Sequence, residues 1–143
     1  MVILIICFSA WAIAQIMKVV IGVIRENRFN WSYFVTSGGM PSSHSATVSA
    51  LATGMGMKYG INSPYFDIAA IVAIVVMYDA AGVRQAVGRM SVILNRVTRE
   101  LREQRPRDEV EKDLKELVGH TPFQVIVGAA IGVFAASVGI LVS

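Results

Sequence analysis

Four long apolar stretches limit most strongly what this chain can fold into. We expect them to be helices over about residues 2–24, 43–59, 65–83 and 122–142. At ~1.5 Å per residue the first is roughly 34 Å long, enough to cross a hydrocarbon core of ~30 Å. The 143 residues are 55% apolar and 16% charged, whereas soluble domains average about 45–50% and about 25%. The sequence therefore predicts an all-α polytopic membrane bundle with about four transmembrane helices, as a single membrane domain over residues 1–143.

The first stretch has a cleavable signal peptide as its alternative interpretation, because residues 10–12 read Ala-Trp-Ala. No basic residue precedes the apolar run, and the run continues past this point, so we favour a retained membrane helix. The single cysteine, Cys7, excludes a disulfide-stabilised scaffold.

A polar segment over about residues 91–118 separates the third and fourth stretches. Apolar residues recur there every three or four positions, which predicts a charged amphipathic arm that Pro106 breaks or kinks. Residues 96–116 hold seven basic and seven acidic side chains, so the net charge of +3 arises elsewhere. We expect the arm to be a solvated helical face. The small basic surplus suits lipid head groups or phosphate, and we expect no nucleic acid partner.

Basic residues outside the arm also predict the topology. If each stretch crosses once, Arg25, Arg28, Arg84 and Arg89 lie on one face, and Lys58 lies alone on the other. The positive-inside rule then makes the first face cytoplasmic and places both termini on the opposite side. We expect a multi-pass protein of the cell (inner) membrane.

Polar residues that a membrane helix does not need gather at this same face. Both histidines, His44 and His120, precede or begin an expected helix, where free backbone N–H groups favour phosphate. Ser42 and Ser43 add hydroxyl donors, and nearby cations can neutralise an anion. Two histidines can divide the work of phosphoryl transfer between a nucleophile and a general acid.

Three strings carry a family resemblance. Pro41-Ser42-Ser43-His44 resembles the Pro-Ser-Gly-His motif of the type 2 phosphatidic acid phosphatase superfamily, which also contains vanadium haloperoxidases. The strings GGMPSSHSA, YDAAGVRQAVGR (78–89) and LKELVGHTPFQVIVG (114–128) resemble its small divergent bacterial and plant branch. The resemblance implies a lipid phosphate phosphatase that hydrolyses a prenyl diphosphate or phosphatidylglycerophosphate-like lipid through a phosphohistidine.

The resemblance also implies a role for individual residues. His120 would attack phosphorus and His44 would protonate the leaving oxygen. The implied phosphate-binding residues are Lys18, Arg25, Gly39, Ser42, Ser43 and Arg84, with Asp79 and Arg89 in supporting positions. The mechanism needs no cofactor and no metal, although Asp79 leaves Mg²⁺ as an alternative.

The chain departs from the superfamily pattern at three positions. Glu26 replaces a proline after Arg25, which makes Arg28 a substitute, and Leu114 replaces an arginine, which passes that role to Arg84 or Arg89. Gln124 replaces an acid four positions after the nucleophile, and we expect its amide to accept the imidazole N–H of His120. In a serine protease, loss of such a carboxylate costs up to ~10⁴ in rate, so Gln124→Glu is expected to raise kcat.

Alternative functions stay open. A catalytically weakened lipid-phosphate-binding or scaffold protein is favoured by Gln124, whereas a small transporter would carry its polar residues nearer mid-membrane. His44 and His120 could be helix caps, Lys18 a snorkelling interfacial residue, and Asp79 an ion-pair partner. The expected partners are a lipid phosphate and the membrane, and a homodimer is compatible with them.

Overall fold

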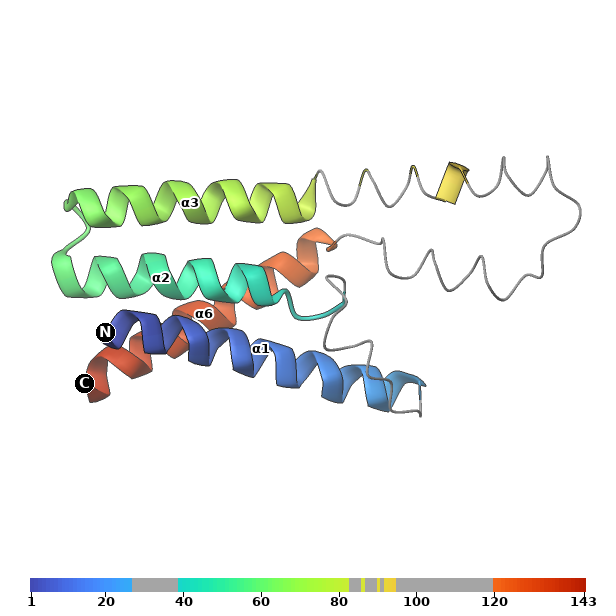
Figure 1. Ribbon diagram of the computed structural model, residues 1–143, viewed down its shortest axis with the longest axis horizontal. Helices are drawn as coiled ribbons and strands as arrows, with labels where there is room; N and C mark the ends of the chain where they lie inside the picture. Colours follow the sequence, from blue (N-terminus) through green and yellow to red (C-terminus); the bar gives the residue numbers. More distant parts are fainter. Residues whose placement is uncertain (27–38, 83–85, 87–89, 91, 95–119) are drawn as a thin grey trace, which may run out of the picture.

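A computed structural model describes residues 1–26, 39–82, 86, 90, 92–94 and 120–143. Its long helices are α1 (Val2–Glu26), α2 (Ser43–Tyr59), α3 (Pro64–Ala81) and α6 (Pro122–Val142), and the described residues contain no strand (Figure 1). The all-α prediction is confirmed, and helix bounds differ from expectation by two residues at most. The expected arm lies outside the described residues except for residues 92–94.

Helix boundaries follow local chemistry. Ser42, Ser63 and Thr121 are the N-cap residues of α2, α3 and α6, and each side chain accepts a hydrogen bond from a backbone N–H three residues later. Both α3 and α6 begin with a proline. Proline is tolerated there because the backbone N–H groups of the first helical turn have no acceptor within the helix, so the N–H that proline lacks is not missed. These caps fix where the polar segments end and the apolar helices begin.

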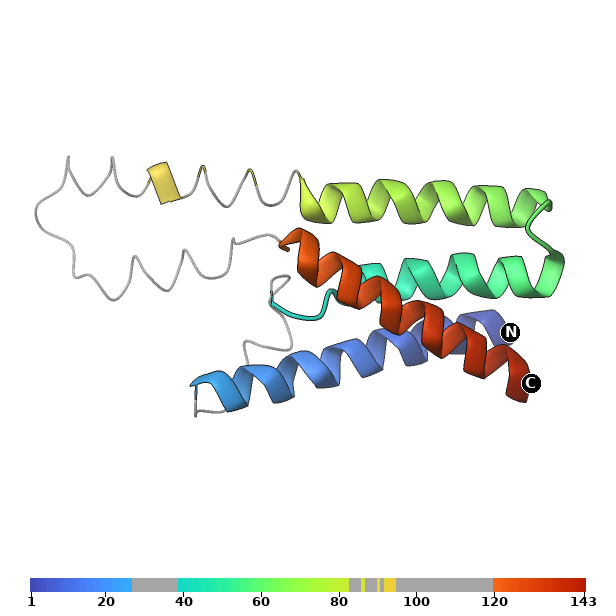
Figure 2. The same cartoon turned by 180° about the vertical axis from the view of Figure 1, so that it is seen from behind.

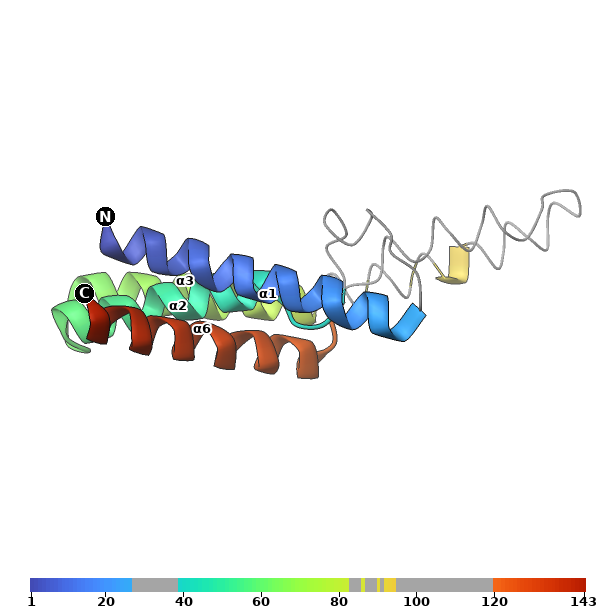
Figure 3. The same ribbon diagram turned by 90° about the horizontal axis from the view of Figure 1, so that it is seen from below.

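α2 is the central helix of the bundle. It contacts α1, α3 and α6, whereas in the described part of the chain α1 and α3 do not contact each other. In Figure 1, α3 and α1 flank α2, and in Figure 2, seen from behind, α6 crosses α2. The view from below in Figure 3 shows α1 and α6 side by side along the bundle, in agreement with their direct contact.

Small residues bring α2 and α6 into backbone contact. Gly128 lies against the carbonyl oxygen of Ser42, and Gly132 lies one turn further along α6 against that of Ala46. A stripe of small residues permits such an approach between membrane helices. At the other end, a buried apolar cluster joins α1, α2 and α6 through Ile3, Ile6, Cys7, Ala10, Ala50 and Ala136.

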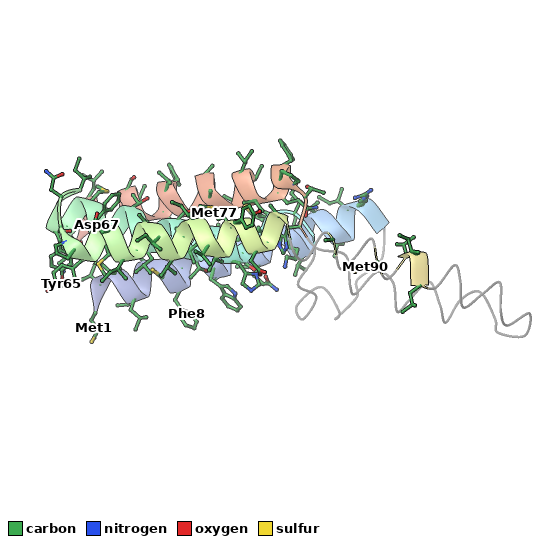
Figure 4. All side chains as sticks on the ribbon, turned by 90° about the horizontal axis from the view of Figure 1, so that it is seen from above. Met1, Phe8, Tyr65, Asp67, Met77 and Met90 are labelled. Atoms are coloured by element: carbon green, nitrogen blue, oxygen red, sulfur yellow. The ribbon has the colours of Figure 1, made fainter. Side chains whose placement is uncertain are left out.

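The outer surface of the bundle is apolar. α1, α3 and α6 are each long and apolar enough to cross a membrane, whereas α2 has only 17 residues. Large side chains point outward, as Phe8 does in Figure 4, and Leu4, Ile71 and Phe134 are 62–71% exposed. A water-soluble monomer rarely exposes so much contiguous apolar surface. The expected number of about four membrane crossings is therefore approximate. It consists of the three candidate spans and the shorter helix α2.

Both chain termini lie at one end of the bundle, together with the α2–α3 turn (Figures 1 and 3). The N-terminal ends of α2 and α6 and the C-terminal end of α3 lie at the opposite end (Figures 1 and 2). This is the arrangement that alternating crossings predict. The bundle thus collects the polar helix starts at a single end.

Candidate functional site

Two histidines from distant parts of the chain meet at this end. His44 is the second residue of α2, and His120 lies two residues before α6. Their ring centroids are 6.2 Å apart, and the rings stand edge to face at 89°. His120 is 0% exposed, whereas His44 is exposed. The two histidines that we expected to act together are thus neighbours, and one ring is buried while the other is exposed.

The segment before α2 is fixed by its main chain. Gly39 has a φ of +100°, a conformation that favours glycine, and the Met40–Pro41 peptide bond is cis. The Ser42 hydroxyl oxygen accepts hydrogen bonds from Ser45 N at 3.3 Å and Ser45 Oγ at 2.9 Å. Its oxygen is thereby engaged in the cap of α2, and both serines are fully buried.

A main-chain hydrogen bond joins the start of α6 to the residue that caps α2. Ser42 N donates to Gln124 O at 3.1 Å. On the same residue, the Ser42 carbonyl oxygen lies against Gly128. The backbone N–H and C=O groups of Ser42 therefore both contact the first two turns of α6. These contacts fix the position of His44 relative to His120.

Lys18 brings a cation from α1 to this region. It is 5% exposed although it lies eight residues before the end of its helix. A Cβ at position 39 would lie 3.4 Å from Lys18 Cγ, so the lysine side chain passes over the bare backbone of Gly39. Gln15, 7% exposed, lies almost one turn earlier on α1. An ammonium group that is this buried next to the start of α2 suits an anionic ligand.

The Gln124 side chain has a different contact from the one expected. Gln124 Oε1 accepts a hydrogen bond from Thr121 N at 3.0 Å, and Gln124 N donates to Thr121 Oγ1 at 3.3 Å. This reciprocal pair is a capping box at the start of α6. The spacing of four had suggested that His120 and Gln124 are neighbours on one helical face. They are not, because His120 precedes the N-cap and lies outside the helix. Gln124 fixes the main chain next to His120.

The remaining predicted residues are distributed unequally. Ser43 is the first residue of α2 and is 5% exposed. Asp79 is half-buried in the last turn of α3, whereas Arg25 is exposed and lies ~10 Å along α1 from Lys18. Arg28, Arg84 and Arg89 lie outside the described residues. Among the residues that the structure describes, no group of three His, Cys, Asp or Glu side chains could hold a metal ion.

Two residues that matter for the geometry were not singled out in the sequence as site residues. Thr121 is the first of them, although the pattern Thr-x-x-Gln at 121–124 is the sequence form of a capping box. Ser45 completes the cap of α2 through Ser42. The first could have been found from spacing alone; the second depends on a side-chain rotamer that spacing does not specify.

The assembled groups fit a phosphate ester. Two helix N-termini supply partial positive charge, a buried lysine supplies a full one, and two imidazoles are side chains of the kind that can act as a nucleophile and as a proton donor. These groups lie at one end of an apolar bundle, where a phosphate head group could reach them while its hydrocarbon chain stays in the bilayer.

Comparison with known proteins gives a family and a membrane relative for this chain. The sequence model of a family described as "Divergent PAP2 family" matches residues 1–135. A Bacillus subtilis (strain 168) protein named "Uncharacterized membrane protein YuiD" is 37% identical over 134 residues, which covers 87% of this chain and 85% of that protein. No solved structure matches this chain significantly. The apolar helices and this membrane relative together make the chain a membrane protein.

Proposed function

The chain belongs to the Divergent PAP2 family, and from this premise we propose that it is a membrane phosphatase that hydrolyses a lipid phosphate through a phosphohistidine. The observation that carries the proposal is the pair of histidine rings with centroids 6.2 Å apart, one buried and one exposed. Each of the two roles in phosphoryl transfer then has one candidate side chain in a suitable environment.

The proposed reaction has two steps. A ring nitrogen of His120 attacks phosphorus and forms an N–P bond while the bond from phosphorus to the lipid oxygen breaks. His44, protonated, donates its proton to that oxygen. Water then attacks the phosphohistidine, His44 accepts a proton from the water, and inorganic phosphate leaves as the His120 ring is restored.

Lys18 and the two helix N-termini would stabilise the charge on the phosphoryl oxygens. Charge stabilisation by fixed groups is strongest where water is excluded, and Lys18 and Ser43 are each 5% exposed. Lys18 approaches from α1 while Ser43 belongs to α2. The phosphoryl group would therefore be held between two helices rather than by a single loop.

The substrate is proposed to be a prenyl diphosphate or a phosphatidylglycerophosphate-like lipid, at the cytoplasmic face of the cell membrane. The location of the histidine pair at one end of the apolar bundle supports a head group at the membrane surface. One observation favours a second candidate, a weakened lipid-phosphate-binding protein: residue 124 is an amide, and its side chain caps α6.

Release of inorganic phosphate from a panel of purified lipid phosphates tests the proposal. We expect turnover of at least one lipid, inhibition by vanadate because its trigonal-bipyramidal form resembles the phosphoryl transition state, and little effect of EDTA. Binding without turnover would favour the second candidate. Activity lost in EDTA and restored by Mg²⁺, without inhibition by vanadate, would instead favour a metal site near Asp79.

A further inference from the structure

Three sides of α2 are occupied by its three partner helices. Towards α6, the backbone of Ser42 and Ala46 meets Gly128 and Gly132. Towards α3, Ser49 Oγ donates to Met77 Sδ at 3.8 Å. Towards α1, a Cβ at Gly54 would lie 3.6 Å from Ile3 Cγ2. Among the described helices, none packs over the remaining side of α2.

That remaining side carries His44, Val48, Leu51 and Met55, which we call the open stripe. Their spacing of four, three and four residues places them on one helical face. His44 is exposed and the other three are half-buried, Leu51 and Met55 because they border the apolar cluster with α1. α1 and α3, the helices on either side, do not contact each other over their described lengths. Figure 1 shows α2 uncovered between them.

The open stripe has the dimensions of one bilayer leaflet. From His44 to Met55 there are eleven steps of ~1.5 Å along the helix, or ~16 Å, about half of a ~30 Å hydrocarbon core. One end is the histidine pair, with buried Lys18 close to the start of α2, and the rest is apolar. A molecule with an anionic head and one hydrocarbon chain matches this order of groups along the helix.

We propose that the hydrocarbon chain of the lipid phosphate lies along the open stripe, between α1 and α3, with its phosphate at His44 and Lys18. This inference rests on the proposed function and adds the path of the lipid tail. Surrounding lipid is as apolar as the stripe, so the contact gains little hydrophobic free energy. Its effect is to align the phosphorus with His120, and misplacement by about 1 Å can cost ~10²-fold in rate.

Photochemical labelling tests the position of the tail without requiring turnover. The probe is a non-hydrolysable lipid phosphonate with a diazirine near the middle of a single long chain, and the control is the same chain ending in an alcohol. We expect the phosphonate to label residues 48–55 more strongly than the alcohol does, with equal background on the outer face of α3. Equal labelling of residues 48–55 by both probes would overturn the proposal.

A second test uses chain length as the variable. Val48→Trp fills the open stripe, whereas Ile71→Trp places the same ring on α3 at a side chain that is 62% exposed. We expect Val48→Trp to lower kcat/KM for a long-chain lipid phosphate about tenfold or more relative to a short, water-soluble alkyl phosphate. Ile71→Trp should leave this ratio unchanged.

The outcomes separate the tail position from the proposed function. A Val48→Trp variant that retains the wild-type ratio, or that loses both substrates equally, contradicts a tail on the open stripe while phosphate release by the wild type still stands. If the wild type releases phosphate from no lipid, the phosphatase proposal fails, and the phosphonate labelling alone decides where a lipid tail binds.

Discussion

His44 and His120 occupy different surroundings although their rings are neighbours. His120 is 0% exposed, which would shield a phosphohistidine from bulk water, whereas exposed His44 can exchange protons with the surroundings. A nucleophile benefits from exclusion of water, and a general acid must be reprotonated in each cycle. At the scale of single residues, the burial of the two rings therefore supports the division of roles that we propose.

The two histidines should respond differently to the leaving group. His44→Ala removes the proton donor, so it should lower hydrolysis of a lipid phosphate by ~10²–10⁴ and affect an aryl phosphate, whose phenolate leaves unprotonated, much less. His120→Ala should abolish both reactions. Initial rates of phosphate release on the two substrates make the comparison, and retained binding of a lipid phosphonate shows that each variant is folded. Equal losses on both substrates for His44→Ala would remove it as the acid.

Gln124 should act through the main chain rather than on the imidazole. Gln124→Glu retains the capping box and adds a favourable negative charge at the helix start, so kcat should stay within about twofold, a change of less than ~0.5 kcal/mol. Gln124→Ala loses the side-chain acceptor of Thr121 N and should lower stability by ~1 kcal/mol. Single-turnover rates and unfolding in detergent measure the two effects. A rise of about tenfold in the Glu variant would restore the expectation that a carboxylate here reaches His120.

The contact between α2 and α6 determines where the two histidines lie. A methyl group at Gly128 would collide with the carbonyl oxygen of Ser42, which is backbone and cannot turn aside. Gly128→Ala should therefore lower stability by ~1–3 kcal/mol and reduce turnover by moving His44 away from His120. Gly54→Ala is the matched control, since a Cβ there would lie 3.6 Å from Ile3 Cγ2, an ordinary van der Waals contact. Unfolding in detergent measures the stability of both variants, and phosphate release measures their turnover. Equal losses in the two variants would contradict this account.

Much at the level of helices followed from the sequence alone. Apolar runs with serine, threonine and proline at their starts placed α2 and α6 correctly. The end of α1 was harder to predict, because polar Arg25 and Glu26 follow the apolar run, and the run alone does not show how far the helix continues past it. The central position of α2 was not predictable either: its small residues indicate close packing, but which partner they meet depends on contacts between segments distant in sequence.

The same limit applies within the candidate site. The two histidines and Lys18 could be found from motif and spacing. The Gln124 contact was missed because the spacing of four assumed a helix that includes His120, whereas α6 begins at Pro122 and residues 121–124 form a capping box. The passage of Lys18 over Gly39 depends on a positive φ at that glycine. Backbone conformation before the two helices, rather than residue identity, decided these details.

The arrangement of the whole bundle gives a topology that can be measured. Ser63 lies in the α2–α3 turn at the end that holds both termini, and Met90, 71% exposed, lies beyond the other end of α3 (Figure 4). In a Cys7→Ser background, we expect an impermeant thiol reagent added to intact cells to label Ser63→Cys but not Met90→Cys, because the positive-inside rule predicts that the basic face is cytoplasmic. Permeabilised cells supply the control for Met90→Cys. The reverse pattern would place the histidine pair outside the cell.

The central claim about the molecule is that phosphate passes through His120. Its most direct test is to mix purified protein with a lipid carrying a radiolabelled phosphate, stop the reaction within one turnover and look for label on the protein. We predict acid-labile, alkali-stable label on the peptide that contains His120, label that is chased by unlabelled substrate and is absent from His120→Ala. Phosphate release at full rate with no labelled protein, or with label unchanged in His120→Ala, would contradict the account.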